Sequence, residues 1–536
     1  MKLLFTWCRH HLIICILAFA AILRLLNLST NPPGLNWDEV SMGYSAYSIL
    51  ETGKDEWGVK YPLLFRSYGE WKSPTYIYVL VPFIKIFGLN AWGVRLPAAI
   101  AGVFAVYLTY LIARKLYGEK VGLWAALFLA VSPWHLMLSR PGYEAGLALT
   151  LMLIGIYLQL KDKVIWAALP YGIALHTYHS AKIVIPFIFG YLALYAYRKI
   201  GIKKLAVSSL ILGIFVLPIA LDLVSGKSQK RFSQVGLTTD AELVERFFKY
   251  RNTFPLGDFG NKLVFNKYTF ILSKGFSNWT SYLSPHFLLG SESIRAQHSI
   301  PFRGVLYFTE FALFCFGIII IFKKHIGVAR YLPLLVIAVA FVPPALTKDI
   351  YHVLRSILTL PWWQMIAAIA MVELQNNKFK YFRFIVYFLI IEVIVFLLTY
   401  FIWYPKAFAR DWQYGVKEMA SWVAQNEHKY KHIYITKSFG EPQLFLAFYN
   451  KWDPEWYQSE NSKLIEYESR GYPWLDQLPE YSLGKYTFRD INWPKDNGNN
   501  EMLYIGKADD FWPDTPHPFE VKFPDGTTSL SASEGK

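Results

Sequence analysis

The chain has 536 residues, of which 54% are hydrophobic and only 17% are charged. Soluble globular proteins carry about 25% charged residues, so this composition excludes an ordinary soluble enzyme and indicates a membrane protein. The formal net charge is +15 at pH 7, but the basic residues recur between apolar segments instead of gathering on one soluble face, which excludes a nucleic-acid partner.

The N-terminal segment has basic residues before an apolar run, as a signal peptide does, but no small-x-small cleavage site follows. We therefore predict a retained first span. A membrane helix needs roughly 20 mostly apolar residues, and such runs lie at 11–28, 94–113, 121–138, 145–160, 164–178, 183–197, 205–222, 304–322, 331–346, 356–374 and 384–402. The predicted fold is an α-helical polytopic membrane protein with about 11 transmembrane helices.

The stretch 74–88 decides on which side of the membrane the later loops lie. If it lies along the membrane surface, the strongly basic short loops all face the cytoplasm, as the positive-inside rule requires. These loops contain Lys2, Arg9, Arg114, Lys115, Lys120, Lys161, Lys163, Arg198, Lys199, Lys203, Lys204, Lys323, Lys324, Arg330, Lys378, Lys380 and Arg383. This predicts a multi-pass plasma-membrane protein with a cytoplasmic N-terminus, whose outer segments are 29–93, 139–144, 176–182, 223–303, 347–355 and 403–536.

The composition changes near residue 402 and predicts two domains. Residues 1–402 form a transmembrane domain, in which 29–93 and 223–303 are large outer loops. Residues 403–536 form an extracytoplasmic soluble domain of α/β type. Its polar end TTSLSASEGK is predicted to be disordered.

Shorter patterns predict further elements in these two outer regions. The first outer loop contains VSMGYSAYSILETG and PTYIYVLVPFIKIFG, whose apolar faces predict two helices at the membrane surface. The C-terminal region is predicted to have a helix around 411–426 and a strand at 432–436.

Asp38 and Glu39 follow the first predicted span directly, in the sequence NPPGLNWDE. Adjacent carboxylates at a membrane surface can bind a cation, take a proton from an acceptor, or cap a helix. Capping is the plain alternative, because Asp38 stands where a helix from about Val40 would begin. We assign both residues as candidate catalytic groups.

Three further residues are predicted at the same outer face. Lys72, in GEWKSP, precedes a helix that begins with proline, where its ammonium can approach a phosphate or extend to lipid headgroups. Arg140 and Glu144 follow a span in SPWHLMLSRPGYEAG and are candidate substrate-binding residues. An arginine that anchors the chain at the lipid interface is an equally good interpretation of Arg140.

The outer loop TKDIYHVLR contains the basic residues Lys348, His352 and Arg355 beside an apolar span. Such a group suits a lipid-linked phosphate, because arginine makes bidentate contacts to phosphate oxygens. The alternative is simple anchoring to lipid headgroups. We assign these three residues, with Lys72, as candidate donor phosphate-binding residues.

The sequence HTYHS places His176, Tyr178 and His179 together after another span. Two histidines without a matching carboxylate cluster are more often hydrogen-bonded interface residues than metal ligands. We therefore predict no metal ligands, assign His176 and Tyr178 as candidate substrate-binding residues, and leave a divalent metal open as a cofactor.

Glu310 and Glu392 lie inside predicted spans, where ionisable groups are rare and mark functional sites by default. They support an alternative function, a non-enzymatic transporter or flippase of lipid-linked glycans. Such a protein is expected to have internal repeats and broken helices around a midplane site, and the sequence has no clear repeat. An accessory subunit of a glycan-assembly complex is a third alternative.

Several motifs occur in a characteristic order. WDE follows the first span, K-x-P precedes a surface helix, RLPAAIAG begins the second span, RKLYG and GLWAALFLAVSPWHLMLSR cover the third, and YHVLR comes late. In this order they resemble the bacterial GT-C glycosyltransferases related to the protein O-mannosyltransferases and the lipid A aminoarabinose transferases. The resemblance covers residues 1–375 and makes 1–402 a GT-C catalytic domain.

The resemblance implies inverting transfer of a sugar from a polyprenyl-phosphate carrier to a lipid, glycan or protein acceptor at the outer face. By the same resemblance, Asp38 is the general base with Glu39 as its companion, and Lys72 and Arg355 lie near the carrier phosphate. Arg140 matches the arginine after the third span. Relatives often have an aspartate five residues after that arginine, whereas this chain departs from the pattern and has Glu144 four residues after it.

Overall fold

The computed structural model describes residues 11–69, 71–224, 235–290, 295–472, 474–498 and 501–535. The chain divides into two compact units. Unit 1 comprises Met1–Arg24, Ala99–Ser139 and Glu144–Phe396, and unit 2 comprises Leu25–Ala98, Arg140–Tyr143 and Leu397–Lys536. Lys2 and Arg9, which we assigned to the cytoplasmic side, lie outside the described residues.

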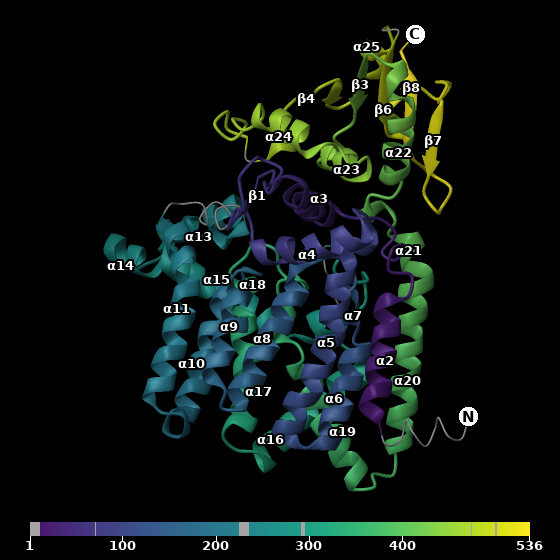
Figure 1. Ribbon diagram of the computed structural model, residues 1–536. Helices are drawn as coiled ribbons and strands as arrows, with labels where there is room; N and C mark the ends of the chain where they lie inside the picture. Colours follow the sequence, from purple (N-terminus) through teal and green to yellow (C-terminus); the bar gives the residue numbers. More distant parts are fainter. Residues whose placement is uncertain are drawn as a thin grey trace, which may run out of the picture. The chain divides into compact units, whose positions relative to one another are not determined.

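Unit 1 is built from helices (Figure 1). Their bounds are α2 (Leu12–Leu25), α5 (Ala91–Tyr117), α6 (Glu119–Val131), α7 (Pro133–Leu138), α8 (Glu144–Leu160), α9 (Val164–Leu175), α10 (Ala181–Ile200), α11 (Ile202–Val224), α13 (Ala241–Thr253), α14 (Gly257–Val264), α15 (Lys267–Tyr282), α16 (Phe308–Lys324), α17 (Val328–Ala340), α18 (Val342–Ala345), α19 (Trp362–Asn376) and α20 (Phe382–Leu398). Helix α9 packs against both α8 and α11, and α19 packs against α6 and α16.

Among the described residues, six helical segments are long and apolar enough to cross a membrane. They are Ala91–Tyr117, Ala181–Ile200, Ile202–Val224, Val328–Ala345, Ile357–Asn376 and Phe382–Ala407. Only 11% of the apolar window of α11 is buried inside the protein, which fits a helix whose apolar side chains face lipid. The chain is therefore a multi-pass membrane protein.

A helix lies over each of the eleven runs that we predicted as spans. Several of these helices are shorter than a full crossing; α9, for example, has 12 residues. The count of eleven spans accordingly stays a prediction.

The N-terminal part of unit 2 contains α3 (Trp37–Thr52), α4 (Pro74–Phe87) and the first turns of α5. Between α3 and α4, the short strands β1 (Phe65–Arg66) and β2 (Trp71–Lys72) pair antiparallel, with Phe65 opposite Lys72. Helices are thus present at both amphipathic stretches of this region, and their position at a membrane surface stays a prediction.

The C-terminal part of unit 2 contains a six-stranded sheet of order β4-β5-β3-β6-β8-β7. The central strand β3 runs parallel to β5 and β6, and the other neighbours are antiparallel. The strands are β3 (His432–Ile435), β4 (Tyr481–Leu483), β5 (Tyr486–Phe488), β6 (Met502–Gly506), β7 (Phe519–Lys522) and β8 (Thr528–Glu534), and the helices are α21 (Tyr404–Ala407), α22 (Val416–Asn426), α23 (Pro442–Tyr449), α24 (Pro454–Ser462) and α25 (Trp493–Asp496). The mixed helix and strand content predicted for this region is present.

The prediction that the polar end of the chain is disordered is wrong. Strand β8 lies between β6 and β7 and is hydrogen-bonded to both. Ser529, Ser531 and Ser533 are buried in this strand. Its backbone groups are satisfied by neighbours on both sides, so a sequence of low hydrophobicity is held by long-range pairing.

Candidate active site

The first turn of α3 carries Asp38 and Glu39, and Asn36 caps this turn. The Glu39 N–H donates to Asn36 Oδ1 at 2.9 Å, and the Asn36 N–H donates to Glu39 Oε2 at 3.1 Å. This reciprocal pair is a capping box, which satisfies two N–H groups that the helix itself leaves unpaired. The capping role therefore falls to Asn36 and Glu39, and Asp38 does not provide the cap.

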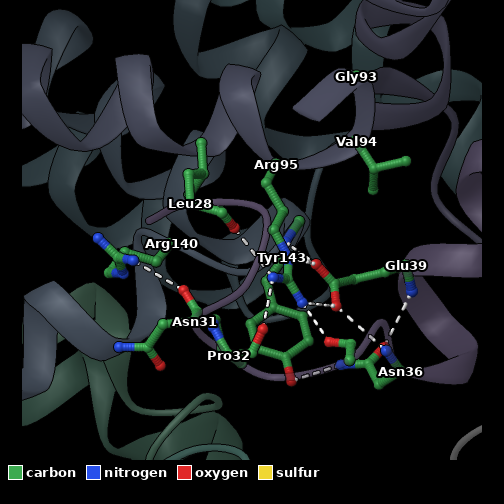
Figure 2. A network of polar contacts seen from close by, with 12 residues as sticks. Leu28, Asn31, Pro32, Asn36, Glu39, Gly93, Val94, Arg95, Arg140 and Tyr143 are labelled. Carbon is green, nitrogen blue, oxygen red and sulfur yellow. Dashed lines mark hydrogen bonds and ion pairs between the residues drawn. The ribbon is translucent and has the colours of Figure 1, made fainter. Parts of the chain in front are cut away.

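Glu39 also forms a buried ion pair with Arg95 (Figure 2). Arg95 Nε donates to Oε1 at 2.8 Å and Nη2 donates to Oε2 at 3.1 Å, and both side chains are 0% exposed. The Gly142 N–H adds a third donor, at 2.8 Å from Oε1. Both oxygens of Glu39 are thus engaged, so this carboxylate is poorly placed to take a proton from a substrate.

Arg95 and Arg140 together hold the loop between Leu25 and Trp37. Arg95 donates to the carbonyl oxygens of Leu28 and Pro32 at 3.0 and 2.9 Å and also to that of Gly34, while Arg140 Nη2 donates to that of Asn31 at 2.7 Å (Figure 2). Arg140 Nη2 also donates to the carbonyl oxygens of Leu26 and Asn27, at 2.7 and 3.4 Å. Loop carbonyls buried without donors are costly, and these two guanidinium groups satisfy six of them. The result is a rigid base for the start of α3.

Arg95 was not among the site residues assigned from the sequence, where it appeared only within the motif RLPAAIAG. A signal for it was present, because a cation inside an otherwise apolar helix usually has a buried partner. Its partner Glu39 could not be identified, since the two residues are 56 positions apart.

Residues 140–143 approach this cluster closely. Tyr143 OH accepts a hydrogen bond from Asn36 Nδ2 at 2.8 Å (Figure 2). A Cβ atom at Gly142 would lie 2.9 Å from the backbone oxygen of Val94, so only glycine allows the approach that brings its N–H to Glu39.

Asp38 lies in a different environment from its neighbour. Its Oδ1 is 3.0 Å from Lys72 Nζ, and the side chains are 39% and 11% exposed for Asp38 and Lys72 respectively. Strand β2 places Lys72 at this position through its pairing with β1. Asp38 is therefore the accessible carboxylate of the pair, held beside a largely buried cation.

Two further carboxyl groups lie in the field of Lys72, and neither was singled out from the sequence. Burial raises the pKa of Glu56 to about 8, and Lys72 opposes this shift. Burial also raises the pKa of Glu441, again opposed by Lys72. No local pattern marks Glu56 or Glu441 in the sequence, because their importance comes from burial beside a lysine that is distant along the chain.

The predicted phosphate-binding residues Lys348, His352 and Arg355 lie in unit 1. Arg355 Nη1 donates to Thr347 Oγ1 at 2.9 Å and is 3.3 Å from Asp349 Oδ2. Its side chain is 15% exposed. Lys348 is exposed, so this loop presents one accessible lysine and a guanidinium that is fixed on two sides.

His352 is packed within the same loop. Its N–H donates to Tyr282 OH at 3.0 Å, its Nδ1 accepts from the Arg355 N–H at 3.3 Å, and its ring lies 4.9 Å from that of His298. The structure thus brings His352 and Arg355 together and adds His298, which was not assigned from the sequence.

The other candidate substrate-binding residues of unit 1 are His176, Tyr178 and Glu144. His176 is the C-cap residue that follows α9, and its Nε2 is 2.7 Å from the carbonyl oxygen of Phe215 in α11. Tyr178 is 3% exposed. Glu144 begins α8 and is partly exposed. Their assignment as substrate-binding residues stays a prediction.

The two glutamates inside predicted spans each have a clear partner. Glu392 accepts hydrogen bonds from the backbone N–H groups of Phe308 and Thr309, at 2.8 and 3.2 Å, and so caps α16. Glu310 accepts from Gln364 Nε2 at 2.6 Å. These contacts give both residues a role in joining helices, which accounts for two of the residues on which the transporter alternative rested.

Within the described parts of the chain, the structure has no group of three or more histidine, cysteine, aspartate or glutamate side chains arranged to hold a metal ion.

Comparison with known proteins gives several partial sequence matches. A family model described as dolichyl-phosphate-mannose-protein mannosyltransferase matches residues 71–221. The chain is 26% identical over 198 residues to the mannosyltransferase-like protein YycA of Bacillus subtilis, covering 34% of this chain and 28% of that protein. It is 35% identical over 112 residues to dolichyl-phosphooligosaccharide-protein glycotransferase 2 of Pyrococcus furiosus, covering 20% and 15%. The matches thus span less than a third of the length of these relatives.

Similarity to solved structures extends over nearly the whole chain. ArnT from Cupriavidus metallidurans, solved bound to undecaprenyl phosphate, has a TM-score of 0.55 at 12% identity and covers 97% of this chain and 98% of its own. The Archaeoglobus fulgidus oligosaccharyltransferase, tethered with an acceptor peptide, has a TM-score of 0.50 at 11% identity and covers 98% and 74%. At such identities the similarity shows the fold.

The protein is a multi-pass membrane protein with the GT-C glycosyltransferase fold. Residues 71–221 match the mannosyltransferase family model, so the resemblance inferred from the sequence is confirmed.

Proposed function

We propose that this protein is a glycosyltransferase that moves a sugar from a polyprenyl-phosphate donor to a lipid, glycan or protein acceptor at the outer face of the plasma membrane, with inversion at the anomeric carbon. The observation that carries the proposal is the Asp38–Lys72 pair, at 3.0 Å, in a protein with the GT-C fold. A carboxylate that is accessible yet held beside a cation has the chemistry of a general base.

In the proposed reaction, Asp38 accepts the proton of the acceptor hydroxyl while the hydroxyl oxygen bonds to the anomeric carbon. The bond between that carbon and the phosphate oxygen breaks, and its electron pair leaves with the polyprenyl phosphate. One carbon–oxygen bond forms and one breaks, so the step needs no oxidant or reductant. Inversion follows if attack and departure occur on opposite sides of the anomeric carbon.

The departing phosphate gains negative charge, which cationic side chains stabilise if they are fixed beforehand. We assign this role to Arg355, whose guanidinium is held by Thr347 and Asp349. Lys348 and His352 are proposed as further phosphate contacts from the same loop. Lys72 is retained as a phosphate contact, because a donor anion can replace part of its interaction with Asp38.

The proposal changes the roles of two other residues. Glu39 and Arg140 are assigned as positioning residues, since both are 0% exposed and both hold the segment that leads into α3. Asp38 alone is proposed to take the proton.

ArnT was solved bound to undecaprenyl phosphate, which supports a polyprenyl phosphate as the carrier here. The oligosaccharyltransferase was solved tethered with an acceptor peptide, which keeps a protein acceptor within the proposal. The choice between a hexose and a pentose, and between acceptor classes, is made by the experiment below.

The test is sugar transfer by the purified full-length chain in lipid vesicles, supplied with radiolabelled polyprenyl-phosphate sugars and candidate lipid, glycan and peptide acceptors. We expect Asp38→Asn to lower transfer by about 10²- to 10⁴-fold, the usual contribution of a general base. Asp509→Asn is the matched control, because Asp509 is exposed in the same unit. Full transfer by Asp38→Asn would exclude Asp38 as the base.

A further inference from the structure

Glu56 lies against the same face of α3 that carries Asp38. Ser41 Oγ donates to Glu56 Oε1 at 3.5 Å, and Ser45 also contributes a hydrogen bond to this carboxyl. Asp38, Ser41 and Ser45 are spaced by three and four residues, so they share one face of the helix. A single helix face therefore presents the proposed base at its exposed end and contacts Glu56 at its buried end.

The position of Glu56 is fixed by a hydrogen bond to its backbone carbonyl oxygen. Asn461 Nδ2 donates to the Glu56 carbonyl oxygen at 2.9 Å and to Tyr68 OH at 3.0 Å. Tyr68 OH is in turn 2.7 Å from Tyr457 OH. This arrangement comes from α24 and holds the segment after α3 in place, so Glu56 cannot easily turn outward to water.

The carboxyl group itself is only partly satisfied. Glu56 is 1% exposed, and its Oε2 has no hydrogen-bond partner among the described residues. A buried charge with so few partners is costly, whereas a neutral carboxylic acid in the same place costs much less and can donate a hydrogen bond.

Lys72 is the cation that several carboxyl groups share. It is paired with Asp38 at 3.0 Å, and it acts electrostatically on both Glu56 and Glu441. If all three carboxylates were ionised, this largely buried group would carry a net charge of about −2. Electrostatics therefore favours an arrangement in which Asp38 is charged, because it is the accessible one, and the other two hold protons.

We infer that Glu56 is a positioning residue that keeps Lys72 on Asp38 by remaining a neutral acid, and that loss of its proton draws Lys72 away and switches the site off. This inference rests on the proposed function of Asp38. It assigns to the site an acidic group that lies 18 residues after Asp38 in the chain and outside every motif noted in the sequence.

The surroundings of Glu56 agree with such a proton. Burial raises the pKa of its carboxyl to about 8, although Lys72, Ser45 and Ser41 lower it and Asp55 raises it. Burial raises the pKa of Tyr44, Tyr68 and Tyr457 above the ordinary tyrosine value, and the charge of Glu56 adds to each shift. These tyrosines stay neutral near pH 8, so they do not change the charge of the site there. The groups whose loss of a proton has to be distinguished are the carboxyl groups of Glu56, Asp55 and Glu441.

The test is the pH dependence of sugar transfer by the full-length chain in vesicles. We expect wild-type transfer to fall about tenfold per pH unit above about pH 8, as one proton is lost. Glutamine resembles the neutral acid, so Glu56→Gln is expected to retain transfer within about threefold at pH 7 and to lose the alkaline decline. Glu441→Gln and Asp55→Asn are the matched variants and should keep the decline.

The outcomes separate this inference from the proposed function. Transfer by Glu56→Gln that declines as the wild type does, or a decline removed by Glu441→Gln or Asp55→Asn instead, would overturn the role of Glu56. Absence of transfer by the wild-type chain at every pH, with every donor offered, would contradict the proposed function itself.

A second measurement does not depend on activity. Infrared difference spectra of the purified chain should contain a component of the carbonyl stretch of protonated carboxylic acids that disappears as the pH rises through about 8 and that Glu56→Gln lacks. Identical spectra for the wild type and Glu56→Gln would overturn the inference even if the variant were less active.

Discussion

Asp38 and Glu39 are adjacent in the sequence and chemically alike, yet the structure uses them differently. Glu39 accepts hydrogen bonds from Arg95, Gly142 and Asn36 and is 0% exposed. Asp38 is 39% exposed in its side chain and pairs with Lys72. Environment rather than residue type separates a positioning carboxylate from a proposed base.

The Glu39–Arg95 pair predicts a large loss of stability on mutation. Removing one partner of a buried ion pair leaves an uncompensated charge and costs about 3–5 kcal/mol. We therefore expect Glu39→Gln to lower the free energy of unfolding by about that amount, measured by denaturant unfolding in detergent. Lys431→Ala is the control, because its pair with Glu501 is 72% and 57% exposed and such surface pairs contribute under about 1 kcal/mol. Equal effects of the two substitutions would contradict this account.

Glu56 also predicts a pH dependence of stability. Its pKa rises from an ordinary 4.5 to about 8 in the folded protein, so between these pH values the folded state holds a proton that the unfolded state has lost. The stabilisation is complete below pH 4.5 and is lost as pH rises through about 8. The thermal midpoint of Glu56→Gln, relative to the wild type, should therefore increase from pH 5 to pH 9, by several degrees. If the difference in thermal midpoint between Glu56→Gln and the wild type stayed constant over this pH range, the raised pKa of Glu56 would be refuted.

Arg355 predicts a specific change in kinetics. Loss of a hydrogen bond to a charged group costs about 1.5–3 kcal/mol, so Arg355→Ala should raise the KM for the polyprenyl-phosphate donor at least about tenfold, while the acceptor KM changes little. The control is Arg246→Ala, whose pair with Glu242 is exposed in the same unit. A normal donor KM in Arg355→Ala would remove the phosphate assignment.

At the scale of elements, α3 shows what a local pattern can predict. We expected this helix near Val40 with Asp38 as the plain candidate for its cap, whereas it begins at Trp37 with Asn36 as the cap. The capping-box spacing of Asn36 and Glu39 is the local signal that marks this earlier start. The amphipathic patterns of α3 and α4 and the apolar runs of unit 1 likewise predicted helices that are present. These signals are local, so one stretch of sequence contains them.

Strand β8 shows where local reasoning fails. Thr528–Glu534 is rich in serine and was predicted to be disordered, but it pairs with β6 and β7. We expect deletion of residues 528–536 to expose two strand edges and to make residues 403–527 sensitive to protease. The measurement is limited proteolysis of the purified chain. Unchanged protease resistance would mean that β8 adds little to the sheet.

At the scale of the whole molecule, composition and apolar runs correctly predicted a multi-pass membrane protein, and the resemblance of the motif order to a known family predicted the GT-C fold. Asp38 and Lys72 could be assigned as candidate site residues because of the order of the motifs in the sequence, and their roles stay a prediction. Arg95, Glu56 and Glu441 could not, because pairing and burial between residues far apart in the chain leave no local pattern.

The predicted orientation can be tested on the intact protein. Reporter fusions that are active only outside the cytoplasm should be active after residue 536 and inactive within 323–330, because the basic loops are expected inside. Activity in the opposite pattern would reverse the topology and place the proposed site on the cytoplasmic side.

Unit 2 is assembled from Leu25–Ala98, Arg140–Tyr143 and Leu397–Lys536. The loop before α3 depends on the last of these segments, since Asn31 donates to the Tyr400 carbonyl oxygen and Arg95 lies 5.8 Å from the Trp412 ring. During synthesis, the segment that contains Asp38 leaves the ribosome long before these contacts can form. The proposed base therefore acquires its final surroundings only late in translation, so a prematurely terminated chain can insert its early helices into the membrane and still lack a finished site.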